Sequence, residues 1–154
     1  MPAQFLDKTG CPPYTLAMFT SEAIQREIAR FTTSIIIDLD AIAHNVRAVR
    51  QHVGPDVSIF AVVKDNAYGH GAVQVSPTIL QSGASRLAIS RIQEGVQLRR
   101  AGISAPILNM CYSVPAELEG HVAYDIASTI VTIEGAQVLS RVAGALGRKA
   151  TVHI

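Results

Sequence analysis

The chain has 154 residues, and its 13 Lys and Arg residues against 12 Asp and Glu residues leave a formal net charge of +1. So small a net charge, without a basic cluster, argues against a nucleic acid or an anionic membrane surface as the main partner. Hydrophobic residues make up 49% of the sequence, but no run approaches the roughly 20 apolar residues that span a bilayer, so we expect a cytoplasmic, globular chain.

The first 33 residues differ from the rest. Gly10, Pro12 and Pro13 interrupt this stretch, and Ser21 is placed to cap a short helix that runs through Ile24 and Ile28. No motif with chemistry occurs in it. We expect residues 1–33 to form an arm or a peripheral helix, followed by one main domain over residues 34–154.

From Ser34 onward, strand-like and helix-like segments alternate. The β-branched run Ser34–Leu39 predicts a strand, and Asp40 is the expected N-cap of a helix that ends at Gly54. The apolar run Val57–Val63 is typical of a strand buried on both faces. Further strands are predicted over Arg86–Ser90, Pro106–Met110, Val122–Ala127 and Ala150–Ile154, and further helices over about 72–81, 91–100, 115–119 and 132–146.

This alternation predicts an α/β fold made of parallel βαβ units with right-handed crossovers. Two architectures fit it, an open doubly wound sheet and a (β/α)8 TIM-type barrel. A doubly wound nucleotide-binding domain is expected to carry a G-x-G-x-x-G turn after its first strand, and this chain has none. Because the last predicted strand, residues 150–154, has no helix after it to cover the edge, we expect an incomplete domain.

The candidate chemistry lies in AVVKDNAYGHG, residues 61–71. Lys64 follows a buried strand directly, and functional sites of parallel α/β folds lie at the carboxyl ends of their strands. Loss of solvent there would lower the pKa of the lysine amine and make it nucleophilic. The alternative interpretation is a lysine whose head group reaches out into water.

The glycine-containing turn after Lys64 offers backbone N–H groups before a helix, an arrangement that binds phosphate. Tyr68 adds a hydroxyl donor to the same turn. Ordinary turn packing would explain Tyr68 and His70 taken singly. A lysine for an aldehyde beside donors for a phosphate indicates pyridoxal phosphate as the cofactor.

The run VVKDNAYGHG resembles the cofactor-lysine signature of the alanine racemases, the fold-type III pyridoxal-phosphate enzymes. IDLDAIAHNVRAVR before it, and GASRLAISRIQEGVQLRRAGI and APILNM after it, are similar to the same family in order and spacing. The resemblance covers about residues 35–154. It implies the N-terminal part of a (β/α)8 barrel, without the C-terminal β domain of the family, and an active site formed between the two subunits of a homodimer.

The resemblance also implies roles for three residues. Lys64 corresponds to the lysine that holds the cofactor covalently and serves as one of two catalytic acid/base groups. Tyr68 corresponds to a tyrosine that donates a hydrogen bond to the cofactor phosphate, and Met110 to an apolar residue beside the cofactor ring. Asp65 stands where the family often has a small residue, and we assign no role to it. The second base of the family has no counterpart in this chain.

We therefore expect the full-length protein to interconvert L-alanine and D-alanine, supplying D-alanine for the cell wall, and this chain alone to be nearly inactive. Three alternatives stay open at this point. They are a racemase for another amino acid, a non-catalytic pyridoxal-phosphate-binding protein, and an inactive fragment.

The other polar residues receive no chemical role. His44 and His52 are expected on the exposed side of their helix, and His121 and His153 lack neighbours at metal-ligand spacing, so no metal site is expected. Two cysteines are too few for a disulfide framework or a zinc site. Cys111 follows Met110 at a strand end, where it could lie near the pocket, but we expect it to be a buried, inert thiol.

Overall fold

The computed structural model describes residues 22, 26, 29, 32–33 and 35–154. The chain divides into two units, Met1–Ile37 and Asp38–Ile154. The arm that the sequence predicts over residues 1–33 falls almost wholly outside the described residues and stays a prediction. All strands of the described residues belong to the second unit.

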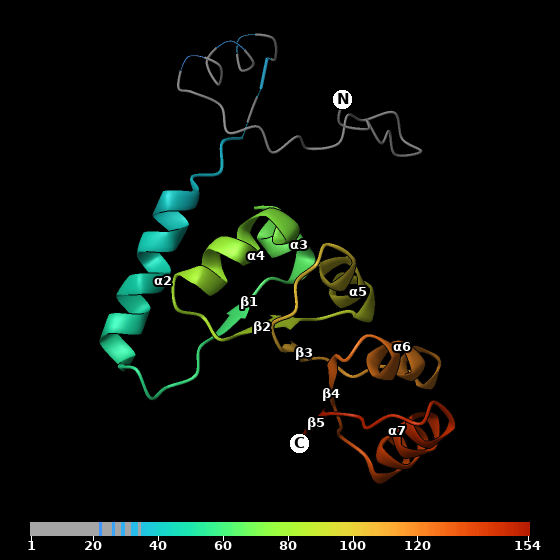
Figure 1. Cartoon of the computed structure of the whole chain (residues 1–154). Helices are drawn as coiled ribbons and strands as arrows, with labels where there is room; N and C mark the ends of the chain where they lie inside the picture. The colour runs from blue at the N-terminus through green and yellow to red at the C-terminus, as the bar shows by residue number, and fades with distance from the viewer. Residues whose placement is uncertain (1–21, 23–25, 27–28, 30–31, 34) are drawn as a thin grey trace. The chain divides into compact units, whose positions relative to one another are not determined.

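A single parallel sheet runs through Asp38–Ile154, with its five strands in the order β1-β2-β3-β4-β5 (Figure 1). Each strand pairs with the next one along the chain, so that Ala61 lies opposite Leu87 and Leu87 opposite Ile107. The strands are β1 (Phe60–Val62), β2 (Arg86–Ile89), β3 (Ile107–Asn109), β4 (Ala127–Thr129) and β5 (Val152–His153).

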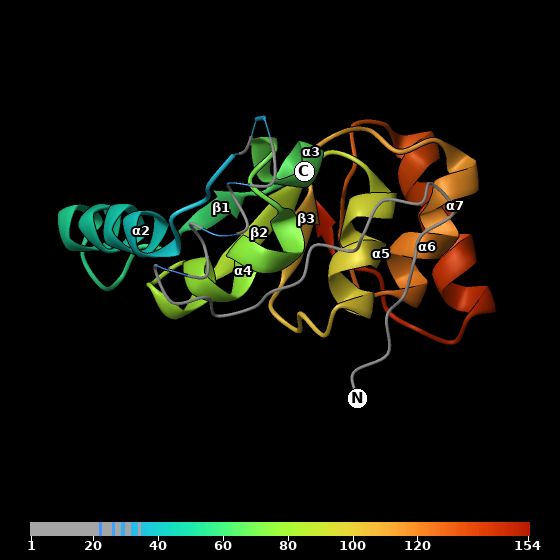
Figure 2. The ribbon, with the colours of Figure 1, turned by 90° about the horizontal axis from the view of Figure 1, so that it is seen from above.

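The helices between the strands follow one another along the same side of the sheet (Figure 2). Right-handed crossovers between sequential neighbours require this arrangement. It is the wall of a (β/α)8 barrel, and it excludes the doubly wound alternative, in which the strand order reverses. The helices are α2 (Leu39–Val53), α3 (Lys64–Tyr68), α4 (Ala72–Gln81), α5 (Ile92–Arg100), the 3-10 turn η1 (Pro115–Glu117), α6 (Leu118–Ala123) and α7 (Ile133–Ala145).

The core lies between the strands and this helical layer. Leu87 and Ile89 on β2, Leu98 on α5 and Ile126 before β4 are buried almost completely. Gly95 on α5 allows the close approach, because a Cβ at this position would stand 2.5 Å from the Ile126 side chain. The aliphatic residues that are so frequent in the sequence therefore pack between the sheet and the helices.

The strand predicted over Ser34–Leu39 is wrong. Residues 35–38 have no regular structure, and helix α2 begins at Leu39. The N-cap is Asp38 rather than Asp40, because the Asp38 carboxylate accepts hydrogen bonds from the N–H groups of Asp40 and Ala41 at 2.9 and 3.0 Å. A β-branched run has the propensity for a strand, but a strand forms only where a neighbour pairs with it.

The strand predicted over Val122–Ala127 is also wrong. Helix α6 extends through Ala123, and β4 begins only at Ala127. Asp125 between them has a left-handed backbone with φ of 51°. Val122 and Ile126 are both buried, one at the end of a helix and one before a strand, so the apolar run spans two elements that pack on the same core.

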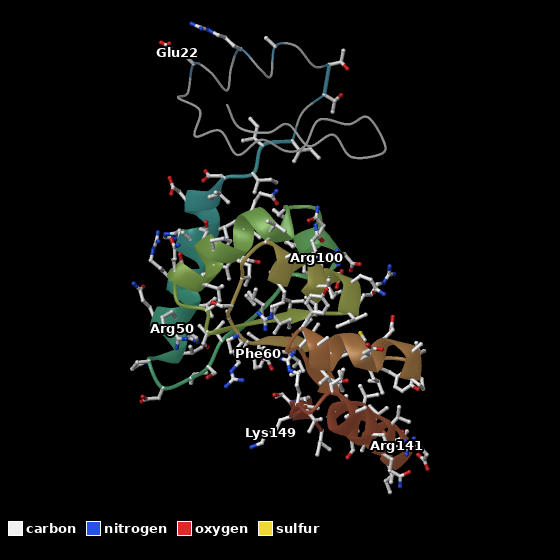
Figure 3. The ribbon with its side chains drawn as sticks, turned by 45° about the vertical axis from the view of Figure 1, so that its right-hand side comes forward. Glu22, Arg50, Phe60, Arg100, Arg141 and Lys149 are labelled. Carbon is white, nitrogen blue, oxygen red and sulfur yellow. The ribbon has the colours of Figure 1, made fainter. Side chains whose placement is uncertain are left out.

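Two arginines fix the loops at the amino ends of the strands. Arg50 lies in the last turn of α2 beside the loop toward β1 (Figure 3), and Arg99 lies in the last turn of α5. The Arg50 guanidinium donates to the carbonyls of Gly54 at 2.7 Å, Val57 at 2.6 Å and Gly83 at 2.7 Å. The Arg99 guanidinium donates to the carbonyls of Ile103 and Ala105 at 2.7 Å, Tyr124 at 2.9 Å and Asp125 at 2.8 Å.

A buried polar network joins β3 to α6. His121 is only 2% exposed, its Nε2 lies 2.8 Å from the Ser113 hydroxyl, and its Nδ1 lies 3.3 Å from the Ile126 carbonyl. The Asn109 amide donates to the Ser113 hydroxyl at 2.8 Å. A neutral ring that donates from Nδ1 and accepts at Nε2 satisfies every one of these contacts. Burial is the main reason that the pKa of His121 lies below its ordinary value of 6.5.

Replacing Arg99 by Ala is expected to lower the free energy of unfolding by about 2 kcal/mol or more, because four carbonyls lose a charged donor. Urea unfolding measures the change. The matched control is Arg100→Ala, which removes the same charge from the exposed side of the same helix end (Figure 3) and should cost less than about 0.5 kcal/mol. Equal losses in the two variants would contradict the role of Arg99.

Acid is expected to destabilise the domain through His121. Since the pKa of His121 is lower in the folded than in the unfolded chain, the unfolded chain takes up a proton first as the pH falls below about 6.5. Stability is complete above that pH and is lost below it, by at most about 1.4 kcal/mol per pH unit. In urea unfolding at pH 7.5 and pH 5.5, the stability difference between the wild type and His121→Gln should shrink at the lower pH. A constant difference would refute the role of the buried ring.

Candidate functional site

The carboxyl ends of the strands bring the candidate residues to one edge of the sheet. Lys64 follows β1, Ser90 follows β2 and Met110 follows β3, and the Met110 N–H donates to the carbonyl of Ile89 on β2 at 2.9 Å. Met110 is 37% exposed, and the Lys64 side chain is 33% exposed. The edge therefore presents an accessible amine and, two strands away, an accessible thioether.

The short segment α3, which begins at Lys64, is a turn with an unusual backbone. Asp65, Asn66, Ala67 and Tyr68 all adopt left-handed conformations, with φ between 51° and 56°. Such a conformation costs roughly 1 to 2 kcal/mol for a residue other than glycine, so the surrounding structure must stabilise this turn. Asn66 contributes directly, because its backbone carbonyl accepts from the N–H of Gly71 and its side-chain oxygen from the N–H of Ala72, both at 2.9 Å.

Glu94 provides the second anchor of the turn. Its Oε1 accepts a hydrogen bond from the N–H of Asp65 at 2.6 Å, and its Oε2 accepts from the N–H groups of Ser90 at 2.9 Å and Arg91 at 3.1 Å. One carboxylate thus joins the residue after Lys64 to the loop after β2. Glu94 is not among the residues predicted from the sequence; its signal is an acidic residue at the third position of helix α5, where a side chain reaches back to the capping residue.

Most of the backbone N–H groups expected to bind the phosphate are not free. The N–H groups of six residues in and after the turn already have acceptors within the protein: Asp65, Ala67, Gly69, His70, Gly71 and Ala72. A left-handed turn is tight enough to close its hydrogen bonds on itself. Tyr68, which is 60% exposed, offers its hydroxyl as an accessible donor for an anion.

Lys64 itself is held as an ammonium. Its Nζ donates to Oδ2 of Asp65 at 3.0 Å and lies 5.3 Å from the centre of the Tyr68 ring. The hydrogen bond to Asp65, and then the charge of Asp65, raise the pKa of the Lys64 amine above 10.5, and Tyr68 and Cys111 add to the effect. Burial lowers this pKa, as expected, but by less than Asp65 raises it, so the expected net lowering is wrong.

Two residues near the site differ from their expected character. Asp65, to which the sequence analysis assigned no role, is the direct partner of the lysine. Cys111 is exposed instead of buried, because it follows the carboxyl end of β3 and points out of the core. Both differences arise at a strand end, where the sequence pattern does not tell which side chains face solvent.

A hollow of about 330 Å³ lies at the opposite end of the sheet. Phe60, Arg86, Ile107 and Ala127 line it, and each of them begins a strand. Lys64 lies at the carboxyl ends and takes no part in it. Among residues 35–154 and the few described before them, no three potential metal ligands gather, and no helix there has the length and hydrophobicity to cross a membrane.

Comparison with known families supplies an independent finding. Residues 37–154 match the family model described as "Alanine racemase, N-terminal domain". The alanine racemases of Desulforamulus reducens and Clostridium perfringens are 42% and 48% identical over 118 residues, which cover 77% of this chain. The matched residues are 32% and 30% of those relatives, so the chain spans about a third of their length.

Solved structures give the same result. The alanine racemase of Clostridium difficile 630 superposes with a TM-score of 0.74 at 36% identity, over 77% of this chain and 32% of the other. The alanine racemase of Bacillus anthracis with bound L-Ala-P superposes with a TM-score of 0.72 at 40% identity, over 77% of this chain and 30% of the other.

Glu94→Gln is expected to loosen the turn that carries Lys64. An amide keeps one acceptor oxygen and turns its NH2 group toward an N–H donor, so one of the two anchored segments loses its bond. We expect faster amide hydrogen exchange in residues 64–71, measured by mass spectrometry, and a loss of about 1 to 3 kcal/mol in unfolding free energy.

The matched control for Glu94 is Glu134→Gln, which removes the same charge from the first turn of α7. It should leave the exchange of residues 64–71 unchanged. Unaltered exchange in both variants would contradict the anchoring role of Glu94.

Proposed function

Because the chain belongs to the alanine racemase family, through the N-terminal domain that its residues 37–154 match, we propose that it carries the cofactor lysine of an enzyme interconverting L-alanine and D-alanine. The observation that supports this most is the placement of Lys64, an accessible amine at the carboxyl edge of a barrel wall, on a turn fixed by Glu94. In the proposed enzyme, Lys64 is catalytic, and Lys64, Tyr68 and Met110 bind the cofactor.

The proposed cofactor is pyridoxal phosphate, and three side chains of the edge fit its parts. The Lys64 amine suits the aldehyde, the Tyr68 hydroxyl suits the phosphate and the Met110 thioether suits the ring. Since six N–H groups of the turn are already bonded, we infer that the phosphate takes its other donors from outside the turn. When bound, this cofactor withdraws electrons from Cα of an amino acid and makes its proton removable.

Racemisation requires the proton to leave Cα on one face and to return on the other. We propose that the Lys64 amine serves one face. Tyr68 is a poor candidate for the opposite face, because its ring lies 5.3 Å from the Lys64 ammonium on the same short turn. We therefore infer that the second base comes from outside this turn, as in a homodimer whose partner completes the site. The proposed setting is the cytoplasm, where the product D-alanine would supply the cell wall.

The proposal predicts covalent labelling of one lysine. After incubation with pyridoxal phosphate, reduction with borohydride and peptide mapping, most of the label should be on Lys64 rather than on Lys8 or Lys149, and Lys64→Ala should lose it. L-Alanine added before reduction should lower the label at Lys64 more than L-serine or L-lysine does. The chain alone should racemise alanine at least about 100-fold more slowly than the Clostridium perfringens enzyme, because one acid/base group contributes that much or more.

Each arm of this experiment has a result that contradicts part of the proposal. Equal labelling of the three lysines would refute the cofactor assignment. Stronger protection by serine or lysine than by alanine would favour a racemase for another amino acid. A racemisation rate comparable to that of the Clostridium perfringens enzyme would refute the inference that the second base lies elsewhere.

A further inference from the structure

The carboxylate of Asp65 forms an ion pair with the amine that the proposed chemistry needs. Lys64 Nζ lies 3.0 Å from Asp65 Oδ2, and the two side chains are 33% and 54% exposed. The Tyr68 ring lies at 5.3 Å. A carboxylate and the face of an aromatic ring both favour an ammonium over a neutral amine. The resting state of this lysine is therefore the protonated one.

The backbone does not account for a charged residue at position 65. Asp65 has φ of 51°, a conformation that both aspartate and asparagine tolerate. Asn66, the next residue, adopts nearly the same conformation with φ of 56° and no charge. Asparagine at position 65 would fit the backbone of this turn equally well. The negative charge of Asp65 therefore has an effect other than shaping the turn.

The backbone of Asp65 is held in place by Glu94. The N–H of Asp65 donates to Glu94 Oε1 at 2.6 Å, and Glu94 is itself bonded to the loop after β2. This bond fixes the backbone from which the Asp65 side chain extends toward Lys64. The contact between Lys64 and Asp65 thus joins two adjacent, partly exposed side chains on an anchored stretch of backbone.

We propose that Asp65 is a positioning residue that keeps Lys64 protonated at the edge of the sheet and so slows its reaction with an aldehyde at neutral pH. The proposal rests on the proposed function in one respect, that the aldehyde is pyridoxal phosphate. Condensation of an amine with an aldehyde forms one C=N bond and releases one water, and it requires the unprotonated amine. Whatever holds the proton on Lys64 therefore delays loading of the cofactor.

The groups that face Lys64 act in the same direction. They are Asp65 and Tyr68 on its own turn and Cys111 in the loop after β3, and each raises the pKa of the amine. Glu94 on α5 contacts the turn through the N–H of Asp65. Because Asp65 has the largest effect, removing its charge should shift the pH profile of Lys64 reactivity toward lower pH.

Asp65→Asn tests the proposal, because it keeps the left-handed backbone and removes the charge. Trace acetylation with acetic anhydride transfers one acetyl group to an unprotonated amine and releases acetic acid, and this neutral reagent does not respond to repulsion between Asp65 and a phosphate. At pH 7.5 we expect Lys64, measured relative to Lys149 in the same chain, to react about two- to fivefold faster in the variant, the range that partly exposed ion pairs support.

The matched control is Asp125→Asn, which removes the same charge from another left-handed aspartate, with φ of 51°, at the opposite end of the strands. It should leave the Lys64 rate unchanged. In the wild type, raising the salt concentration should accelerate acetylation of Lys64 by screening the ion pair, a measurement that holds even if the variant fails to fold. Unchanged Lys64 rates in Asp65→Asn and at high salt would overturn the proposal.

Labelling with pyridoxal phosphate separates this proposal from the proposed function. Faster acetylation of Lys64 in Asp65→Asn, without any selective cofactor label, would support the positioning role and refute the cofactor assignment. Selective cofactor labelling of Lys64 at the same rate in both proteins would leave the cofactor assignment intact and refute the role of Asp65.

Discussion

The left-handed turn after β1 is the constraint on which the site depends. Four successive residues that are not glycine adopt this conformation, and each is disfavoured when isolated. The turn persists because Asn66 closes it toward α4 and Glu94 holds it from α5. The position of Lys64 therefore depends on hydrogen bonds to α4 and α5, as well as on the strand that it follows.

The two ends of the strands have different physical roles. At the amino ends, the guanidinium groups of Arg50 and Arg99 donate hydrogen bonds to loop carbonyls, which fixes the connections to the sheet. At the carboxyl ends, the polar atoms of Lys64, Asp65 and Tyr68 stay accessible. This division is general for barrels, in which one end serves stability and the other serves chemistry.

The electrostatics of the site have a consequence for any reaction of Lys64. An amine at the end of a dry strand would lose its proton easily, but this amine lies between a carboxylate and an aromatic ring. Its resting form is the ammonium, and a bound aldehyde has to displace the contact with Asp65. The fold provides the location of the nucleophile, and a single neighbouring residue determines how readily it reacts.

The alternation of apolar and amphipathic segments was sufficient to predict a parallel α/β wall, helix α4 at its observed bounds, and Lys64 at a strand end, because these features depend on local periodicity and on strand direction. Ser34–Leu39 and Val122–Ala127 were wrong as strands, since pairing partners and helix ends are decided by neighbours distant in the sequence. Tertiary geometry likewise decides that the amides of the turn are hydrogen-bonded, that Cys111 is exposed and that Glu94 contacts two loops. The sequence by itself determined which residues are available for chemistry, and only the packed structure decided which of them touch and which keep their protons.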